Sequence, residues 1–176
     1  MIELIIREME AKDVMGIVAL IRGELGYNDI SSDVYDRVVR IYKAENYTVF
    51  VAEEENRVIG FVGLMRGLAF ELDGEYIRVI ALAVSREFQS RGIGSKLEER
   101  VEQYAKETGA NSIVLSSGLS RTRAHTFYTE KGYEKKGFSF IKLLDTGKKF
   151  SYRDVVYKPI PSRLNKAERF DDDEDE

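Results

Sequence analysis

A glycine-bearing turn, Gln89-Ser90-Arg91-Gly92-Ile93-Gly94-Ser95, follows a long apolar run and precedes a helix-like pattern. The first N–H groups of a helix have no acceptor within the helix, and the helix dipole adds positive potential there, so such a turn can bind an anion. Glycines let the backbone approach an oxygen because no Cβ intervenes. Arg91 can add a charge-assisted bond to a phosphate. These residue types therefore indicate a phosphate-binding turn.

Other phosphate-binding motifs fit this turn less well. A Walker A loop requires Gly-Lys followed by Ser or Thr, whereas Gly94-Ser95-Lys96 has the reverse order. A Rossmann fingerprint requires a third glycine three residues after the second, and Leu97 stands at that position. Taken alone, the turn also fits a simpler interpretation, in which its glycines only permit tight packing between the strand and the helix.

A second stretch with reactive side chains is Ala124-His125-Thr126-Phe127-Tyr128, which places the only histidine of the chain near a tyrosine. A serine hydrolase would need a nucleophile for His125, but no Gly-x-Ser-x-Gly motif is present, and Ser116-Ser117-Gly118 is only a polar strand end. We therefore interpret His125 as a structural or cofactor-contacting residue.

The composition excludes several kinds of site. The 176 residues include no cysteine and one histidine, which excludes disulfides, cysteine nucleophiles and multi-histidine metal cages. No apolar run reaches the length of a membrane span. The first residues contain an early acid, Glu3, and no long apolar block, so they do not indicate a secretory signal. We expect a cytoplasmic protein that binds no metal.

The net charge of −4 comes from the C-terminal end, because residues 171–176 are all acidic. Residues 162–176 are too polar to pack and are expected to be a disordered acidic tail. Residues 1–161 are expected to form a single domain that ends at Pro159 and Pro161. The nearly neutral body does not indicate binding to nucleic acid or to a membrane.

Hydrophobic periodicity predicts the elements that position these residues. Four helices are expected, at about 14–25, 34–42, 93–109 and 124–131, with Ser31 and Ser32 as N-cap candidates of the second. Gly109 and Gly132 are expected to end the last two. Strands are expected at about 2–7, 47–52, 58–64, 76–84, 112–116, 136–143 and 150–157.

This order, β-α-α-β-β-β-α-β-α-β-β, predicts an α/β fold in the broad sense, an α+β arrangement whose mixed sheet carries helices on its faces. Residues 47–52 and 58–64 are expected to form a hairpin around the polar turn 53–57. Residues 76–84 are nearly continuously apolar, which is typical of a strand that is buried on both faces.

In sequence the chain resembles the GNAT superfamily of N-acetyltransferases. Their signature, Gln/Arg-x-x-Gly-x-Gly/Ala at the start of the helix after the fourth strand, is matched by residues 89–94, and Ala81-Leu82-Ala83-Val84 matches the usual end of that strand. Residues 121–133 are similar to the Ala-His-x-Phe-Tyr-x-x-x-Gly-Phe/Tyr segment of many bacterial members, and Glu24-Leu25-Gly26-Tyr27 is also similar to them. The resemblance covers residues 2–158 and implies the GNAT fold, with a central mixed, mostly antiparallel sheet.

The resemblance implies acetyl-CoA as cosubstrate. Its pyrophosphate would lie on the backbone amides of residues 91–95, and its pantetheine arm would pair with the exposed backbone of Leu82 to Val84, as an added strand does. A bulge near Leu82 would aim a backbone N–H at the thioester carbonyl. The implied cofactor-binding residues are Leu82, Ala83, Val84, Gln89, Arg91, Gly92, Ile93, Gly94 and Ser95.

Tyr128 occupies the position where the family commonly has its general acid, which returns a proton to the departing CoA thiolate. A tyrosine with an ordinary pKa near 10 is protonated at neutral pH and can donate. Tyr128 could instead pack between the helix and the sheet beside Phe127 and Tyr133. However, successive helical residues point about 100° apart, so Phe127 and Tyr128 cannot both be fully buried.

The general base does not follow from the resemblance. Many members carry Glu or His on the fourth strand at the positions of Arg78 and Ile80, and neither of these side chains can accept a proton. Other carboxylates that could serve as base or bind the acceptor are Glu24, Glu71, Asp73 and Glu75. A chain of water molecules that accepts the proton is an equal alternative.

The sequence therefore predicts an acetyl-CoA-dependent N-acetyltransferase that transfers acetyl to a primary amine, on a small molecule or a peptide, by direct attack. The absent base motivates an alternative, a non-catalytic acetyl-CoA-binding sensor or interaction module. An aminoglycoside acceptor would require the acidic residues to converge on one groove. Family members often dimerise, so a homodimer is a further possibility.

Overall fold

The structure is a computed structural model that describes residues 3–25, 33–142 and 144. Its strands are β1 (Ile5–Glu8), β2 (Tyr47–Glu54), β3 (Arg57–Leu68), β4 (Glu75–Val84) and β5 (Ser112–Leu115). Its helices are α1 (Val14–Glu24), α2 (Val34–Lys43), α3 (Ile93–Thr108) and α4 (Thr122–Glu130), with short 3-10 turns η1 (Ala11–Asp13) and η2 (Arg86–Phe88). None of the helices in these ranges is both long and apolar enough to cross a membrane.

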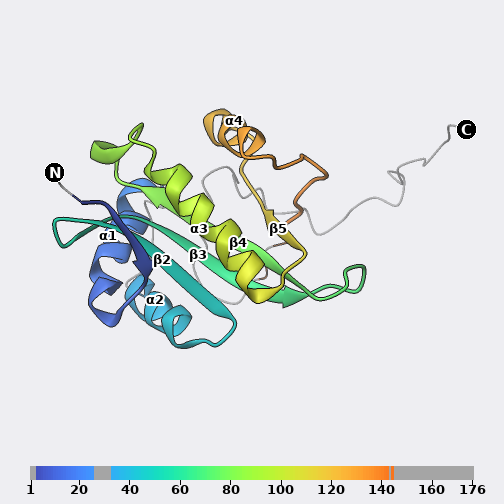
Figure 1. Cartoon of the computed structure of the whole chain (residues 1–176), viewed down its shortest axis with the longest axis horizontal. Helices are drawn as coiled ribbons and strands as arrows, with labels where there is room; N and C mark the ends of the chain where they lie inside the picture. The colour runs from blue at the N-terminus through green and yellow to red at the C-terminus, as the bar shows by residue number, and fades with distance from the viewer. Residues whose placement is uncertain (1–2, 26–32, 143, 145–176) are drawn as a thin grey trace, which may run out of the picture.

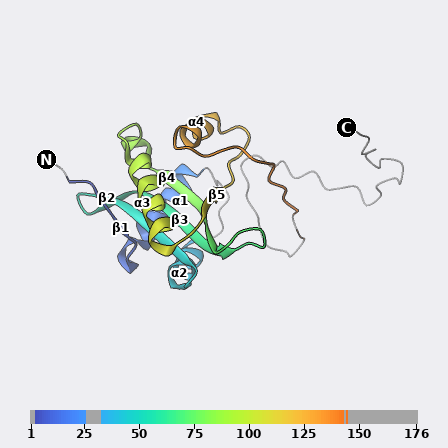
Figure 2. The ribbon, with the colours of Figure 1, turned by 45° about the vertical axis from the view of Figure 1, so that its right-hand side comes forward.

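The five strands form one sheet in their chain order, with β1 and β5 at opposite edges (Figures 1 and 2). The pairs β1–β2, β2–β3 and β3–β4 are antiparallel, and β4–β5 is parallel. A parallel pair needs a crossover, and α3 supplies it. The predicted mixed, mostly antiparallel sheet is confirmed, and so is the predicted order of elements as far as α4.

The prediction of a strand at 136–143 is wrong over residues 136–142, which form no strand. A strand needs a neighbour that satisfies its backbone groups, and no described strand pairs with this segment. The predicted strand at 150–157, the N-cap candidates Ser31 and Ser32, the domain end at 161 and the tail 162–176 all lie outside the described residues.

The predicted hairpin is confirmed, with a tighter turn than expected. Strands β2 and β3 extend to Glu54 and from Arg57, which leaves only Glu55 and Asn56 between them. Both residues have positive φ values, 51° and 61°. This backbone matches the two-residue turn that suits the right-handed twist of paired strands.

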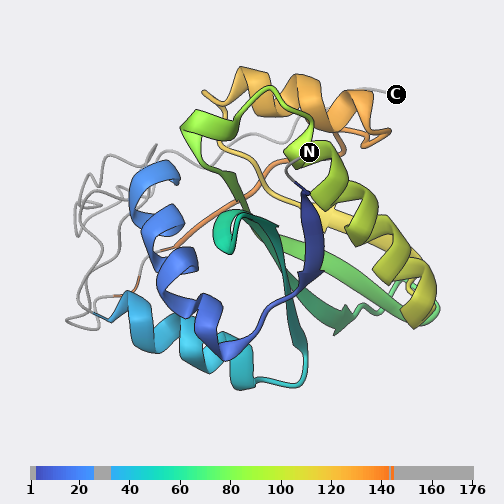
Figure 3. The ribbon, with the colours of Figure 1, turned by 60° about the vertical axis from the view of Figure 1, so that its left-hand side comes forward.

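Two apolar layers lie on opposite faces of the sheet, since successive strand residues point to opposite sides. Helices α1 and α2 cover one face, where Ile17, Val38 and Val51 are buried together. Helix α3 covers the other face and buries Leu97 and Val101 against it. Figure 3 shows the sheet between these helices. The layers fix α3, and hence the turn that begins it, against the sheet.

Strand β4 departs from the expectation that it is buried on both faces. Its first half is well covered, with Ile77 fully buried, whereas Ile80 is 40% exposed and Leu82 and Val84 are half-buried. The reason lies in β5, which pairs with β4 only from Tyr76 to Val79. Beyond that point no described strand covers this side of β4.

A buried ionic cluster ties β1 to the rest of the fold. Arg7 of β1 donates to both carboxylate oxygens of Asp13, at 2.7 and 2.9 Å, and to Glu53 of β2. Asp13 also accepts the backbone N–H of Glu10 at 2.7 Å. Although burial opposes its charge, these hydrogen bonds hold the pKa of Asp13 below its usual value.

Asp13→Asn should destabilise the fold by about 3 kcal/mol at pH 7, because it removes the charge-assisted hydrogen bonds that Arg7 donates to a buried carboxylate. A carboxylate with a lowered folded-state pKa stabilises the protein above its unfolded pKa, and this stability is lost as pH falls through the folded pKa. The difference between Asp13→Asn and the unmodified protein should therefore shrink below about pH 4. Urea unfolding at pH 7 and pH 3 measures it. A difference that does not change with pH would contradict this account.

Candidate functional site

The end of β4 has an open backbone edge. Pairing with β5 ends at Val79 opposite Leu115, so β3 is the one described strand that pairs with Leu82 to Val84. The β3–β4 register also shifts between Gly63 and Leu64, which leaves Ile80 as an extra residue on β4. A bulge of this kind bends a strand and leaves a backbone group unpaired. It lies two residues before Leu82.

Directly after β4 and η2, the glycine turn adopts a left-handed backbone. Ser90 has φ 63°, and Gly92, the N-cap of α3, has φ 79° and ψ 3°. A Cβ on Gly92 would meet nothing within 4 Å. Glycine is therefore favoured here by the backbone conformation and not by a lack of space.

In the described part of the chain, no side chain caps the amides that begin α3. The first helical bond runs from the N–H of Lys96 to the carbonyl of Gly92, at 3.1 Å. The N–H groups of Ile93, Gly94 and Ser95 precede that bond and have no acceptor within the helix. The Ile93 side chain is buried, so only its backbone can serve a ligand. This arrangement can hold an anion.

Arg91 is held beside the turn by a residue that sequence reasoning missed. Its guanidinium donates to both carboxylate oxygens of Glu54, at 2.9 Å to Oε2 and 3.2 Å to Oε1, and lies 5.1 Å from the ring centre of Phe88. Glu54 is buried, whereas Arg91 is 49% exposed. No local sequence signal identifies Glu54, because it is 37 residues away.

Gln89 connects the turn to the open strand edge. Its side-chain Nε2 donates to the carbonyl oxygen of Val84 at 3.0 Å. Gln89, the first residue of the family signature, thus contacts the Val84 carbonyl, which belongs to the backbone stretch expected to face the cofactor. This bond sets the path of the chain between the strand edge and the uncapped amides.

Helix α4 carries Tyr128 and His125. The Tyr128 ring packs edge-on against Phe127 and Tyr133, with ring centres 5.2 and 5.5 Å apart. Burial raises the pKa of Tyr128, and the charge of Arg121 acts in the opposite direction. His125 Nε2 lies 2.9 Å from the carbonyl oxygen of Gly118, a contact consistent with its interpretation as a structural residue.

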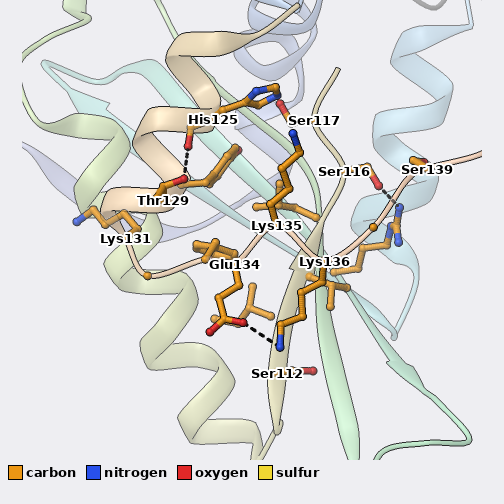
Figure 4. A pocket seen from close by; sticks show the side chains of 18 of the residues that line it. Ser112, Ser116, Ser117, His125, Thr129, Lys131, Glu134, Lys135, Lys136 and Ser139 are labelled. Carbon is orange, nitrogen blue, oxygen red and sulfur yellow. Dashed lines mark hydrogen bonds and ion pairs between the residues drawn. The ribbon is translucent and has the colours of Figure 1, made fainter. Parts of the chain in front are cut away.

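A cavity of about 1790 Å3 lies between α3, β5, α4 and the chain that follows α4 (Figure 4). His125 and Tyr128 line it, together with Ser112 and Ser117 of β5 and the following loop. The residues of the glycine turn do not. Tyr128 therefore belongs to the cavity wall. The ring of its neighbour Phe127 lies beside the glycine turn, 3.9 Å from where a Cβ of Gly94 would stand.

The four candidate carboxylates do not converge. Glu24 ends α1 and accepts the backbone N–H of Arg86 at 3.1 Å, just after β4. Glu71 and Asp73 are exposed in the β3–β4 loop, and Glu75 begins β4, 3.5 Å from Arg66. A strand rises about 3.3 Å per residue, so Glu75 is roughly 20 Å from Leu82. Only Glu24 lies near the open edge.

The two β4 positions that carry a base in many GNAT proteins hold Arg78 and Ile80 in this chain, and both have structural roles. Arg78 donates to Ser116 Oγ at 3.0 Å and so joins β4 to the end of β5. Ile80 is the bulged residue. Within the described part of the chain, no group of three or more His, Asp or Glu side chains could hold a metal ion.

Comparison with known proteins yields relatives that are N-acetyltransferases. N-acetyltransferase 8 of Mus musculus is 31% identical over 113 residues, which make up 64% of this chain and 49% of that protein. The uncharacterized N-acetyltransferase YhdJ of Bacillus subtilis (strain 168) is 28% identical over 107 residues, 60% of this chain and 75% of that protein. The chain spans about half the length of the N-acetyltransferase 8 proteins that it matches.

Solved structures share the fold. The aminoglycoside acetyltransferase AAC(6')-Iy, in complex with the bisubstrate analog CoA-S-monomethyl-acetylneamine, superposes with a TM-score of 0.71 at 16% identity. The match covers 81% of this chain and 98% of that one. Residues 17–133 match the acetyltransferase (GNAT) family, which accounts for most of the described sheet and for all four helices except the first residues of α1. The chain belongs to the acetyltransferase (GNAT) family.

Proposed function

We propose that this chain binds acetyl-CoA at the open edge of β4 and the uncapped start of α3 and transfers the acetyl group to a primary amine by direct attack. The observation that carries the proposal is the divergence of β5 from β4. No described strand pairs with Leu82 to Val84 on the side away from β3, where the Val84 carbonyl accepts a hydrogen bond from Gln89. From this edge the chain continues through the glycine turn to the amides of residues 93–95.

The open edge of β4 and the start of α3 suit two different parts of acetyl-CoA. The amide-bearing pantetheine arm can pair with backbone groups as an added strand does. The pyrophosphate can accept from the amides of α3, where the dipole favours negative charge. Arg91 can supply a further bond from beside the turn, although Glu54 already balances its charge. We therefore expect the backbone, and not Arg91, to contribute most to phosphate binding.

Transfer requires two proton movements. The acceptor nitrogen loses a proton as it attacks the thioester carbon. The C–S bond then breaks, its electron pair goes to sulfur, and we assign the proton that neutralises this thiolate to the hydroxyl of Tyr128. Tyr128 regains a proton from water. The proton of the amine goes to water or to Glu24, the one candidate carboxylate near the edge.

Among the similar solved structures are aminoglycoside acetyltransferases, and the carboxylates of this chain bear on whether such an acceptor fits. The AAC(6')-Iy structure is a complex with the bisubstrate analog CoA-S-monomethyl-acetylneamine, and a cationic aminoglycoside acceptor would suit a convergent acidic groove. Glu71, Asp73 and Glu75 lie at the far end of β4 from the open edge. We therefore propose an acceptor with a single primary amine, on a small molecule or a peptide. Glu71 and Glu75 do not contact this acceptor in the proposal.

Calorimetry with acetyl-CoA, followed by CoA release across a panel of amines, tests this function. We expect binding with a Kd of about 1–100 μM and turnover with at least one monoamine. The panel should include small monoamines, peptides with a free α- or ε-amine, and an aminoglycoside. Binding without turnover on any amine would favour the alternative, a non-catalytic acetyl-CoA sensor. If acetyl-CoA does not bind at all, both the acetyltransferase and the sensor hypothesis are contradicted.

A further inference from the structure

Glu98 is the most deeply buried carboxylate among the described residues, at 2% exposure. It lies on α3, one helical turn after Gly94. The other buried carboxylates, Asp13, Glu53 and Glu54, each pair with an arginine. Glu98 forms no ion pair with any residue in the described ranges, and its Oε2 atom is buried without a hydrogen-bond partner.

The remaining oxygen, Oε1, accepts a hydrogen bond from the hydroxyl of Tyr133 at 3.1 Å. The Tyr133 ring packs edge-on against Tyr128, with ring centres 5.5 Å apart and planes inclined by 68°. Glu98, Tyr128 and Tyr133 all line the cavity beside β5. A buried carboxyl on α3 is thus linked through one tyrosine to the proposed proton donor on α4.

The surroundings of Glu98 disfavour its charged form. Burial raises the pKa of Glu98, and the negative charges of Glu99 and Glu102 on the same helix act in the same direction. The hydrogen bond from Tyr133 and the charge of Lys131 oppose them. Other charged or titratable residues also line the shared cavity: Lys106 on α3 itself, and Arg78, His125, Glu134, Lys135 and Lys136 on neighbouring segments.

We propose that Glu98 is a positioning residue that acts through Tyr133 on Tyr128 and makes proton donation by Tyr128 depend on whether Glu98 is itself protonated. The inference rests on the proposed function. When Glu98 is neutral, Tyr128 can lose its proton to the thiolate without meeting a nearby negative charge. When Glu98 is ionised, its charge opposes the phenolate that this transfer leaves behind.

Kinetics of Glu98→Gln across pH tests this role, with each rate divided by that of the unmodified enzyme at the same pH. The division removes the ionisation of the amine, which is common to both enzymes. We expect the kcat ratio to be lowest at the most acidic pH and to rise about five-fold or more as pH increases through the raised pKa of Glu98 and the unmodified Glu98 ionises. Glu107→Gln, the same charge change at an exposed position of α3 that does not line the cavity, should give a flat ratio. A flat ratio for Glu98→Gln as well would overturn the proposal.

A second measurement needs no turnover. Protein labelled with 13Cζ-tyrosine contains ten tyrosines, and the signals of Tyr128 and Tyr133 are assigned by their loss in the Phe variants. We expect both signals to shift with one midpoint, above the ordinary glutamate value of about 4.3, and to stop shifting in Glu98→Gln. If only Tyr133 responds, Glu98 does not reach Tyr128 and the proposal fails. If both respond but no amine is acetylated, the proposed function fails while the Glu98–Tyr133–Tyr128 coupling stands.

Discussion

Gly94→Asp should weaken acetyl-CoA binding by about 100-fold or more while the protein remains folded. Gly94 is the second residue of α3, directly after Ile93, and its N–H is one of the uncapped amides. A carboxylate there faces the phosphates with like charge at close range, and such repulsion amounts to several kcal/mol where water is partly excluded. A 100-fold loss corresponds to about 2.7 kcal/mol.

The same substitution should not harm the fold. A Cβ on Gly94 would lie 3.9 Å from the ring of Phe127, an ordinary contact. An acidic side chain in the first turn of a helix also interacts favourably with the helix dipole. We therefore expect an unchanged or slightly raised Tm. Gly92→Asp is a poorer test, because its positive φ strains any other residue.

Two matched variants separate bulk from charge at this position. Gly94→Ala adds only a methyl group, and the family signature admits alanine here, so its Kd should stay within about three-fold of the original. Gly94→Asn has the size of Asp without its charge and should fall between the two. Calorimetry measures all three values of Kd. Intact binding by a folded Gly94→Asp protein would remove the proposed phosphate site.

Tyr128→Phe should lower kcat by about 100-fold, the low end of what a positioned general acid contributes, with the Kd for acetyl-CoA nearly unchanged. The phenylalanine ring keeps the edge-on contacts with Phe127 and Tyr133, so the variant removes the hydroxyl alone. Because burial raises the pKa of Tyr128, its hydroxyl stays protonated throughout the neutral range and can donate there.

Steady-state rates and calorimetry together check this expectation. Tyr42→Phe is a suitable control, since Tyr42 is exposed on α2 and should tolerate the change in both kcat and Kd. A Tyr128→Phe enzyme with the original kcat would show that another group or water protonates the thiolate. A parallel loss of affinity would indicate that Tyr128 supports cofactor binding through packing.

Local patterns in the sequence were sufficient to predict most elements of the fold. The apolar periodicity of α3 and the strand-like run of β4 depend on residues a few positions apart, which interact through the backbone regardless of the rest of the chain. Gly109 and Gly132 were predicted to end helices, and both have the left-handed φ values, 70° and 85°, that glycine adopts without strain. The glycine turn at 89–94 was located by the same local logic.

Contacts between distant segments could not be predicted in this way. Arg91 was expected to be available to a phosphate, yet it pairs with Glu54 of a strand 37 residues earlier. Nothing near Glu98 in the sequence indicates its contact with Tyr133, 35 residues later. The strand-like pattern of 136–142 forms no strand, because pairing needs a neighbour as well as a propensity.

The sequence by itself determined the order of elements as far as α4 and the family, and it predicts an anion-binding turn at residues 89–95. Only the tertiary structure decided which side chains meet, because the path of the chain through the sheet sets those distances. It leaves Leu82 to Val84 with an open edge, since β5 stops pairing with β4 at Val79. It also places Glu24 near that edge and Glu75 a strand length away, although both are carboxylates that the sequence treats alike.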